Sequence, residues 1–354
     1  MPGGGARLTQ RDIARLAGVS QATVSLVLNR RGDGSARIPQ ETRERVLEVI
    51  RATGYVADPA AQKLVGRRNQ LLGVFTYEPV FPTLQADFYT PFLLGIEGAA
   101  ERFGYDLLLF TSAPVTDGRR RIFHENNRLR LADGCILLGR TLDRDELGRL
   151  VASGYPFVAV GRRDDAGGPV PYVGADYAAA TAALVRQAVA LGHRRLAFIG
   201  PGCGAESSDD RWAGFRIAVE ETGVGWIHEP AQDRDPGEIV DGLLREGATA
   251  ALVEDQADAV VLERAARDRG VAVPGDLSLI ALGNPTRPVA TDIAFTCFRI
   301  PREEMGRQAV EILTLVMGGE EQGRQRLLPC ELAEGQTLGP VPDRMPDKRK
   351  GRRN

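Results

Sequence analysis

The sequence predicts a small all-α domain at the N-terminus, followed by an α/β body made of two Rossmann-like lobes. Three stretches within residues 9–53 place apolar residues at helical spacing. From Leu71 onward, short apolar runs alternate with amphipathic stretches in two successive series. Strands that alternate with helices form parallel sheets covered by helices, so each series predicts one lobe.

The first two predicted helices are joined by a tight turn. The first covers residues 9–18, with Thr9 as a good N-cap and Gly18 where the chain turns. Ser20 can cap the second, which covers residues 21–29. Two short helices around a glycine-containing turn make a helix-turn-helix motif, whose second helix fits the major groove of DNA. On periodicity alone, a generic three-helix bundle explains the pattern equally well.

The rest of the N-terminal region has the character of a nucleic-acid-binding domain with a linker. A third helix is predicted over about residues 39–53 and ends at Gly54. Pro59 stands at the first helical position of the stretch DPAAQKLVG, and residues 67–70 form a linker. Residues 1–68 contain twelve basic and six acidic side chains, a net charge of +6, whereas the whole chain has −2. A basic head on an acidic body is typical of a protein that binds phosphate backbones.

The body divides into two series of strands and helices. In the first, we predict strands over residues 71–77, 105–112, 134–139 and 156–161, and helices over about 88–103, 118–130 and 143–153. In the second, we predict strands over residues 171–176, 196–201, 250–255 and 277–283, and helices over about 177–191, 210–222 and 257–269. Ligands bind where the strand ends of such sheets face a shared cleft, so we expect a binding site between the lobes.

The composition argues against several classes of protein. The four cysteines lie far apart without a CxxC pair, which speaks against a zinc ribbon and indicates a reducing compartment. The polar, glycine-rich start lacks the apolar core of a secretory signal, and no apolar run is long enough to cross a bilayer. We therefore expect a cytoplasmic protein.

Catalytic chemistry finds little support in the sequence. The three histidines, His124, His193 and His228, are scattered without acidic or cysteine partners at ligand spacing. The glycine cluster at 200–204 lacks both the Lys-Ser/Thr of a P-loop and GxGxxG spacing, and no GxSxG occurs. We expect no enzyme, no metal and no cofactor.

Several long strings give a more specific signal than any single motif. The string LTQRDIARLAGVSQATVSLVLN resembles the head of the LacI/GalR family of regulators, with an aliphatic–Ala pair, then AGVS, then TVSxxLN. ETRERVLEVIRATGY resembles the third helix of that head, and DPAAQKLVGRR resembles its hinge. The similarity continues through FLLGIEGAAERFGYDLLL, DDRWAGFRIAVEETG and IPREEMGRQAVEIL, and covers nearly the whole chain except its ends.

This resemblance implies a transcriptional repressor that binds a palindromic operator as a homodimer. The body would have the periplasmic-binding-protein fold and hold a small-molecule effector, carbohydrate-derived or acidic, in the inter-lobe cleft. The hinge would fold into a helix on the operator, and Leu64 matches the leucine that wedges into the minor groove. Packing of Leu64 against the body is the alternative. A solute-binding protein of the same fold, or a regulator that has lost small-molecule control, are the alternative functions.

The residues expected to contact DNA lie in the head and hinge. Gln21 can make two hydrogen bonds to an adenine, and several small polar side chains suit phosphates. The full set is Thr9, Ser20, Gln21, Ala22, Thr23, Ser25, Leu26, Asn29, Arg37, Thr42, Tyr55, Ala61 and Leu64. Leu26 stands where the family usually has arginine, which predicts less dependence on guanine at the facing base.

The residues expected to bind the effector surround the cleft. They are Phe88, Tyr89, Arg162, Arg211, Trp212, Glu254, Asp255 and Asn284. Arg211 matches the arginine that family members use on ligands. Gly161 and Gly283 stand where an aspartate is frequent, and glycine would enlarge the pocket. These changes predict an effector that is bulkier than a neutral monosaccharide or carries an acidic group.

The resemblance also suggests the domain boundaries. We expect the head and hinge over residues 1–68, an N-terminal lobe over 70–168 with 297–327, a C-terminal lobe over 172–294 with 328–340, and a disordered basic tail over 341–354. The lobes exchange segments because the chain would cross between them at hinge strands.

Overall fold

The computed structural model describes residues 8–28, 38–55, 69–78, 86–116, 119–125, 127–285 and 290–341. The chain folds into two units, Met1–Asn69 and Gln70–Asn354, which we call the head and the body. Four residues predicted to contact DNA lie outside the described residues, namely Asn29, Arg37, Ala61 and Leu64. The predicted tail also lies outside them from residue 342 onward.

The described part of the head consists of α1 (Gln10–Ala17), α2 (Gln21–Leu28) and α3 (Gln40–Thr53). Gly18 ends α1 in the left-handed conformation, at φ 64°, which glycine adopts without a Cβ penalty. This sharp turn brings α2 across α1, and Ile13, Val24 and Val46, one from each helix, meet in a fully buried core. The buried stripe fixes which face of α2 is turned outward.

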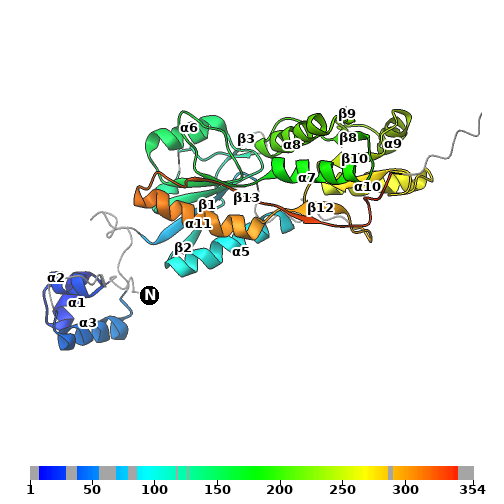
Figure 1. Ribbon diagram of the computed structural model, residues 1–354. Coiled ribbons are helices and arrows are strands. Elements are labelled where there is room, and N and C mark those ends of the chain that lie inside the picture. Colours follow the sequence, from blue (N-terminus) through cyan, green and yellow to red (C-terminus); the bar gives the residue numbers. More distant parts are fainter. Residues whose placement is uncertain are drawn as a thin grey trace, which may run out of the picture. The chain divides into compact units, whose positions relative to one another are not determined.

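The first sheet of the body is parallel, with its described strands in the order β13-β7-β6-β5-β1-β2. The bounds are β1 (Leu71–Thr76), β2 (Asp106–Phe110), β5 (Gly134–Leu138), β6 (Phe157–Val160), β7 (Tyr172–Ala175) and β13 (Gln325–Leu328). The helices α5 (Ala86–Phe103) and α11 (Arg302–Gly318) lie side by side on one face (Figure 1). The helix α6 (Arg144–Ser153) covers the other face.

The second sheet has its described strands in the order β14-β12-β11-β10-β8-β9, and β14 runs antiparallel to β12. The bounds are β8 (Arg195–Ile199), β9 (Gly225–Glu229), β10 (Ala250–Val253), β11 (Ser278–Ala281), β12 (Thr296–Arg299) and β14 (Glu331–Ala333). The helices α7 (Tyr177–Ala190) and α8 (Glu206–Thr222) pack together on one face, and α9 (Pro236–Arg245) and α10 (Gln256–Asp268) cover the other (Figure 1).

At two of its crossings between the lobes, the chain completes one more strand before it crosses than the predicted domain boundaries imply. The strand β7 pairs with β6 and β13 in the first sheet, although residue 172 was expected to open the C-terminal lobe. The strand β12 pairs with β11 and β14 in the second sheet, although residue 297 was expected in the N-terminal lobe. Each of these two strands pairs within one sheet, and the chain then passes to the other lobe. The helix that follows, α7 after β7 and α11 after β12, therefore packs in the other lobe.

The helix predicted over residues 118–130 does not form. Two-residue strands β3 (Val115–Thr116) and β4 (Arg119–Arg120) pair there, and a short 3-10 turn follows at Leu129–Leu131. The side chain of Asn127 donates to the carbonyl of Ile122 at 2.5 Å and accepts from the N–H of Leu129 at 2.7 Å. These local bonds satisfy backbone groups that a helix would otherwise pair.

The second lobe contains elements that were not predicted, namely the strands β9, β12 and β14 and the helix α9. The start of α9 carries a readable signal, because Asp235 caps it and Pro236 occupies its first turn. The helix α8 also begins four residues before the predicted start at 210. Within the described ranges, no helix is both long and apolar enough to span a bilayer.

Candidate DNA-reading face and inter-lobe cleft

The exposed face of α2 carries the side chains that were predicted to read base edges. Val24 and Val27 are buried in the core of the head, so the helical period turns Gln21, Ala22 and Leu26 outward. Leu26 is 54% exposed. A leucine on this face can contact only apolar surface, such as the methyl group of a thymine.

The hydroxyl groups of Thr9 and Ser20 are engaged in helix caps. The Oγ of Ser20 accepts from the N–H of Thr23 at 3.1 Å and lies 2.9 Å from the hydroxyl of Thr23. Thr9 caps α1, and its hydroxyl donates to Asp12 at 2.7 Å. The hydrogen bonds from Thr9 lower the pKa of the Asp12 carboxyl. If these hydroxyl groups contact phosphates, the new hydrogen bonds would form beside the helix-capping hydrogen bonds or in place of them.

Three other residues predicted to contact DNA are half-buried, namely Ser25, Thr42 and Tyr55. Tyr55 packs against the core of the head, so its ring also serves the fold. Sequence reasoning missed Arg45, whose Nε donates to the carbonyl of Ala17 at 3.0 Å and ties α3 to the end of α1. Whether any of these residues contacts DNA remains a prediction.

A cavity of about 130 Å³ lies between the two lobes of the body. Its walls come from α5 and α11 on one side, from α7 and α8 on the other, and from the segments after β5, β6 and β10. Six predicted effector-binding residues line it, namely Phe88, Tyr89, Arg162, Arg211, Glu254 and Asp255. Sites for drug-sized ligands usually measure roughly 300–1,000 Å³, so this cavity suits a compact molecule.

Two predicted effector-binding residues do not line this cavity. Trp212 follows Arg211 on α8, and a helix turns adjacent side chains about 100° apart. It stacks on Phe215 at 5.7 Å between ring centroids and lies 4.6 Å from the ring of His228. The Oδ1 of Asn284 accepts from the N–H of Ile300 at 2.6 Å, which fastens the segment after β11 to the start of α11. Both residues thus have structural contacts, and their part in effector binding stays a prediction.

The two glycines do not enlarge the cavity, contrary to the sequence-based expectation. A Cβ on Gly161 would lie 3.1 Å from the guanidinium of Arg163, which already fills that space. A Cβ on Gly283 would lie 3.2 Å from Ile300 and 3.4 Å from the guanidinium of Arg211. Each glycine thus makes room for an arginine of this chain, and not for a larger ligand.

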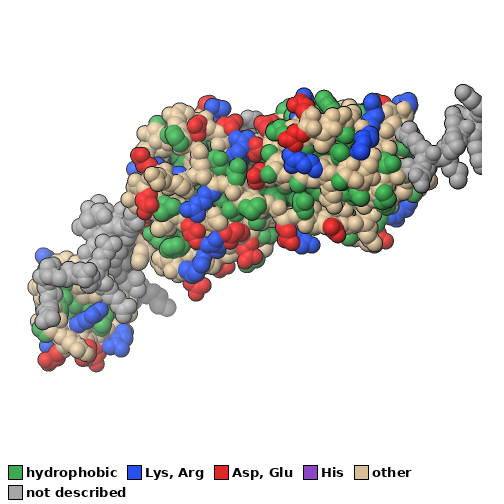
Figure 2. Space-filling model, viewed as in Figure 1, with side chains coloured by type: hydrophobic (Ala, Val, Ile, Leu, Met, Phe, Trp, Pro, Cys, Tyr) green, Lys and Arg blue, Asp and Glu red, His purple; other side chains and the backbone are tan. Residues whose placement is uncertain are grey.

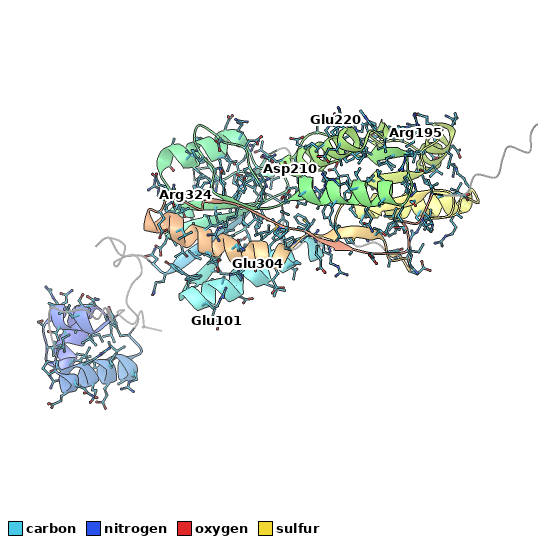
Figure 3. The ribbon with its side chains drawn as sticks, viewed as in Figure 1. Glu101, Arg195, Asp210, Glu220, Glu304 and Arg324 are labelled. Carbon is cyan, nitrogen blue, oxygen red and sulfur yellow. The ribbon has the colours of Figure 1, made fainter. Side chains whose placement is uncertain are left out.

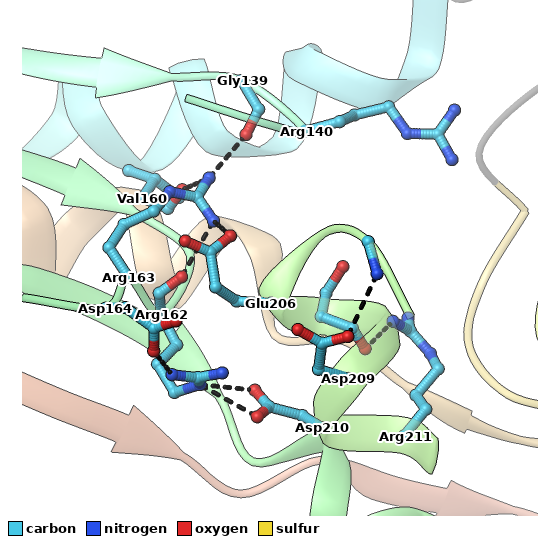
Figure 4. Close-up of polar contacts among 12 residues, drawn as sticks. Gly139, Arg140, Val160, Arg162, Arg163, Asp164, Glu206, Asp209, Asp210 and Arg211 are labelled. Carbon is cyan, nitrogen blue, oxygen red and sulfur yellow. Dashed lines mark hydrogen bonds and ion pairs between the residues drawn. The ribbon is translucent and has the colours of Figure 1, made fainter. Parts of the chain in front are cut away.

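Arg162 and Arg163 form ion pairs with α8 across the gap between the lobes (Figure 4). The Nε of Arg162 donates to both carboxylate oxygens of Asp210, at 2.8 and 2.9 Å. Asp210 itself lies where the two lobes meet (Figure 3). Burial opposes the charge of Arg162, but its hydrogen bonds to Asp210 and Asp164 prevail and raise its pKa. The charge of this arginine is thus compensated by the protein itself.

Arg163 is the more deeply buried of the two, at 4% exposure. It donates to Glu206 at 3.1 Å and to the carbonyl of Gly139 at 2.7 Å (Figure 4). Burial lowers the pKa of its guanidinium, and the charge of Glu206 opposes that effect. Sequence reasoning missed Arg163, because nothing in the RR pair indicates which arginine turns inward.

Two further arginines are buried in the walls of the cavity, Arg211 at 7% and Arg302 at 8% exposure. Arg211 donates to the carbonyls of Leu282 at 2.8 Å and Ser207 at 2.7 Å, and its guanidinium lies 4.0 Å from the ring centre of Tyr177. Arg302, which sequence reasoning also missed, opens α11. On the visible surface of the body, by contrast, acidic and basic side chains are interspersed (Figure 2).

The acidic residues of the cavity have different roles. Asp255 caps α10, where its carboxylate accepts from the N–H of Ala257 at 2.8 Å. One oxygen of Glu254 accepts from the hydroxyl of Ser208, while its Oε2 is buried without a hydrogen-bond partner among the described residues. Glu254 thus retains one oxygen without a described hydrogen-bond partner.

None of the three histidines lines the cavity. His193 is fully buried between Thr249 and Gly339, and the Nε2 of His228 bonds the carbonyl of Gly200 at 2.9 Å. The described residues contain no group of three or more His, Cys, Asp or Glu side chains that could hold a metal ion. The geometry of the cleft is that of a binding site for a small polar molecule.

Comparison with known families gives one match in the head and another in the body. Residues 9–58 match the model for bacterial regulatory proteins of the lacI family, and residues 185–338 match the model for a periplasmic binding protein-like domain. The first match contains the three described helices of the head, and the second contains most of the second lobe together with α11.

Individual proteins match over nearly the whole chain. Catabolite control protein A of Priestia megaterium is 29% identical over 323 residues, which cover 88% of this chain and 93% of that protein. A crystal structure of the Lac repressor dimer bound to operator and the anti-inducer ONPF has a TM-score of 0.72 at 22% identity, covering 94% of this chain and all of that one. A complex of the transcriptional regulator CelR with cellobiose has a TM-score of 0.57 at 26% identity, covering 94% and 100%.

Proposed function

Because the chain belongs to the lacI family of bacterial regulatory proteins, we propose that it is a transcriptional repressor that binds a palindromic operator as a homodimer. The observation that carries this proposal is the exposed face of α2, which presents Gln21, Ala22 and Leu26 to the outside of a family-matched helix-turn-helix head. A single recognition helix of this length reads only a few base pairs, and pairing two heads on two half-sites supplies the missing specificity.

The cleft of the body would bind the effector. Supporting this role, a compact cavity between two α/β lobes is lined by aromatic, basic and acidic side chains, and the similar regulator CelR is described in complex with cellobiose. An effector changes operator affinity only if it binds one arrangement of the lobes better than the other. The cross-lobe pairs of Arg162 and Arg163 would contribute to the arrangement with closed lobes.

Binding, and not catalysis, is the proposed role of the cleft, and the cytoplasm is the proposed location because the head must reach chromosomal DNA. Arg211 and Glu254 are placed to hold polar groups of a ligand, as donor and acceptor. The predicted contacts of Asn29, Arg37, Ala61 and Leu64 with DNA are part of the same proposal.

Site selection from random DNA tests the proposal directly. The wild-type chain should enrich a palindromic sequence, and Leu26→Arg should change the preferred base at one symmetric pair of positions toward guanine, because arginine makes two hydrogen bonds to guanine and leucine makes none. Identical sequence logos would show that Leu26 does not face a base.

Salt dependence of the selected complex supplies the control. If the paired heads neutralise about six phosphates, affinity should fall roughly 10³-fold between 50 and 200 mM salt. A flat response, or no enriched sequence, would contradict the proposed DNA binding.

A further inference from the structure

We propose that Arg211 and Arg302 together bind an anionic group, a carboxylate or a phosphate, in the cleft. This inference rests on the proposed effector role of the cleft and adds the chemical class of the effector. It differs from the site for a neutral sugar because it assigns the principal contact to two buried positive charges.

The first argument is the lack of compensating charge. Among the described residues, neither Arg211 nor Arg302 forms an ion pair, whereas Arg162 and Arg163 in the same cavity both do. The acceptors of Arg211 are two backbone carbonyls, and those of Arg302 are carbonyls at 3.4 Å. Because a buried charge is costly unless it is paired and well hydrogen-bonded, these two side chains favour an anion beside them.

The second argument is the hydrogen-bonding state of Arg302. Its Nε is buried and has no partner in the described part of the chain, and its guanidinium lies 5.2 Å from the ring centre of Phe88. Burial lowers the pKa of Arg302, and the positive charge of Arg211 acts in the same direction. Tyr177 and Asp255 oppose this effect. Both guanidinium groups line the same cavity, so an anion bound there would offset their two positive charges.

The third argument concerns the rest of the ligand. Glu254 also lines the cavity, and its buried Oε2 has no described partner, so it can accept a hydrogen bond from a ligand hydroxyl. Phe88 and Phe92 supply apolar wall between these polar groups. A cavity of about 130 Å³ admits only a compact molecule. The complementary ligand is a small acid or phosphate ester that also carries a hydroxyl group.

Thermal unfolding of the full chain with simple anions tests the anchor without knowledge of the natural effector. The probes are sodium phosphate and sodium acetate, titrated at constant ionic strength against sodium chloride, with glucose as the neutral comparison. We expect a saturable rise in the Tm of the body with phosphate or acetate, and the stronger of the two distinguishes a phosphoryl from a carboxylate ligand. No saturable rise with either anion would overturn the inference.

Substitutions of Arg302 test whether the anion binds at the proposed site. Arg302→Met should weaken binding of the active anion at least about tenfold, which corresponds to ~1.4 kcal/mol, since it removes one of two charges. Arg302→Lys, which keeps the charge but not the planar fork, should retain part of the binding and carries the test if the methionine variant does not fold. Arg186→Met changes an arginine of an exposed ion pair on α7 and should bind like wild type. Equal anion binding by wild type and both Arg302 variants would overturn the proposed site.

Operator binding is measured separately, in chloride buffer without the anion. Arg186→Met changes a side chain outside the cleft and should bind the selected operator like the wild type. If the wild-type chain binds the operator but shows no anion response, the anchor alone is refuted. Loss of operator binding by the wild-type chain would instead refute the proposed function.

Discussion

The reading face of the head and the cleft of the body place their functional side chains under opposite physical conditions. On α2, Gln21 and Leu26 are exposed and take no part in the core of the head. In the cleft, Arg163 and Arg211 are almost fully buried and bonded to neighbouring elements. The head can therefore change its DNA sequence preference with little effect on stability, whereas in the cleft stability and ligand binding depend on the same side chains.

The largest expected effect comes from breaking a buried pair in the cleft. Glu206→Gln leaves the charge of Arg163, which is 4% exposed, without its carboxylate partner. Removing one partner of a buried ion pair costs about 3–5 kcal/mol, and because Glu206 is partly exposed we expect a loss near the lower end of that range. Urea unfolding of the wild type and the variant measures it.

A matched pair on the surface serves as the control. Glu221 pairs with Arg186, and both side chains are 50% exposed. Glu221→Gln should change the free energy of unfolding by less than about 1 kcal/mol, because water screens such pairs. If both variants lose the same stability, the proposed contrast between buried and exposed pairs is wrong.

An intermediate effect is expected on the reading face. Gln21→Ala should weaken binding to the selected operator by about 1–3 kcal/mol if Gln21 bonds an adenine, while the stability of the head changes by no more than roughly 0.5 kcal/mol. Gel shifts measure the first quantity and thermal unfolding the second. Binding to a scrambled DNA of equal length is the control and should not change, because phosphate contacts dominate there. A matching loss on both DNAs would argue that Gln21 does not read bases.

The contrast between the head and the cleft also explains which features the sequence could predict. The three described helices of the head follow from periodicity, and the caps Thr9 and Gly18 determine where α1 begins and ends. The alternation of strands and helices also predicts the two sheets of the body. The helix expected over residues 118–130 failed because side-chain bonds of Asn127 to the backbone replaced it, and single-residue competition of this kind leaves no periodic signal.

The cleft was less predictable because its geometry depends on residues distant in sequence. Arg163 turns inward beside Gly161, and its partner Glu206 is 43 residues away. Arg302 reaches the cavity because α11 returns to the first lobe after β12, a crossing that the predicted boundaries placed one strand too early. Six of the predicted effector-binding residues line the cavity, whereas Trp212, adjacent in sequence to Arg211, stacks on Phe215 and does not line it.

The smallest expected effect is a dependence of stability on pH that arises in the body and not in the head. All three histidines of the chain lie in the body. His193 is fully buried, with Nδ1 2.8 Å from the hydroxyl of Thr249 and Nε2 3.0 Å from the carbonyl of Gly339. Burial lowers the pKa of His193 below its usual value of about 6.5, although the bond to Gly339 opposes this effect. The unfolded chain thus binds a proton more readily than the folded chain does.

The sign of the effect follows from that difference. Above pH 6.5 both states hold His193 neutral and its contribution to stability is complete, whereas below pH 6.5 the unfolded state gains a proton first and stability falls. The Tm of the body should therefore fall between pH 7 and 5, and His193→Gln should reduce the slope even if it lowers the Tm at every pH. His124→Gln, a half-buried histidine outside this hydrogen-bond pair, should keep the wild-type slope. An unchanged slope in His193→Gln would mean that carboxylates alone cause the acid sensitivity of the body.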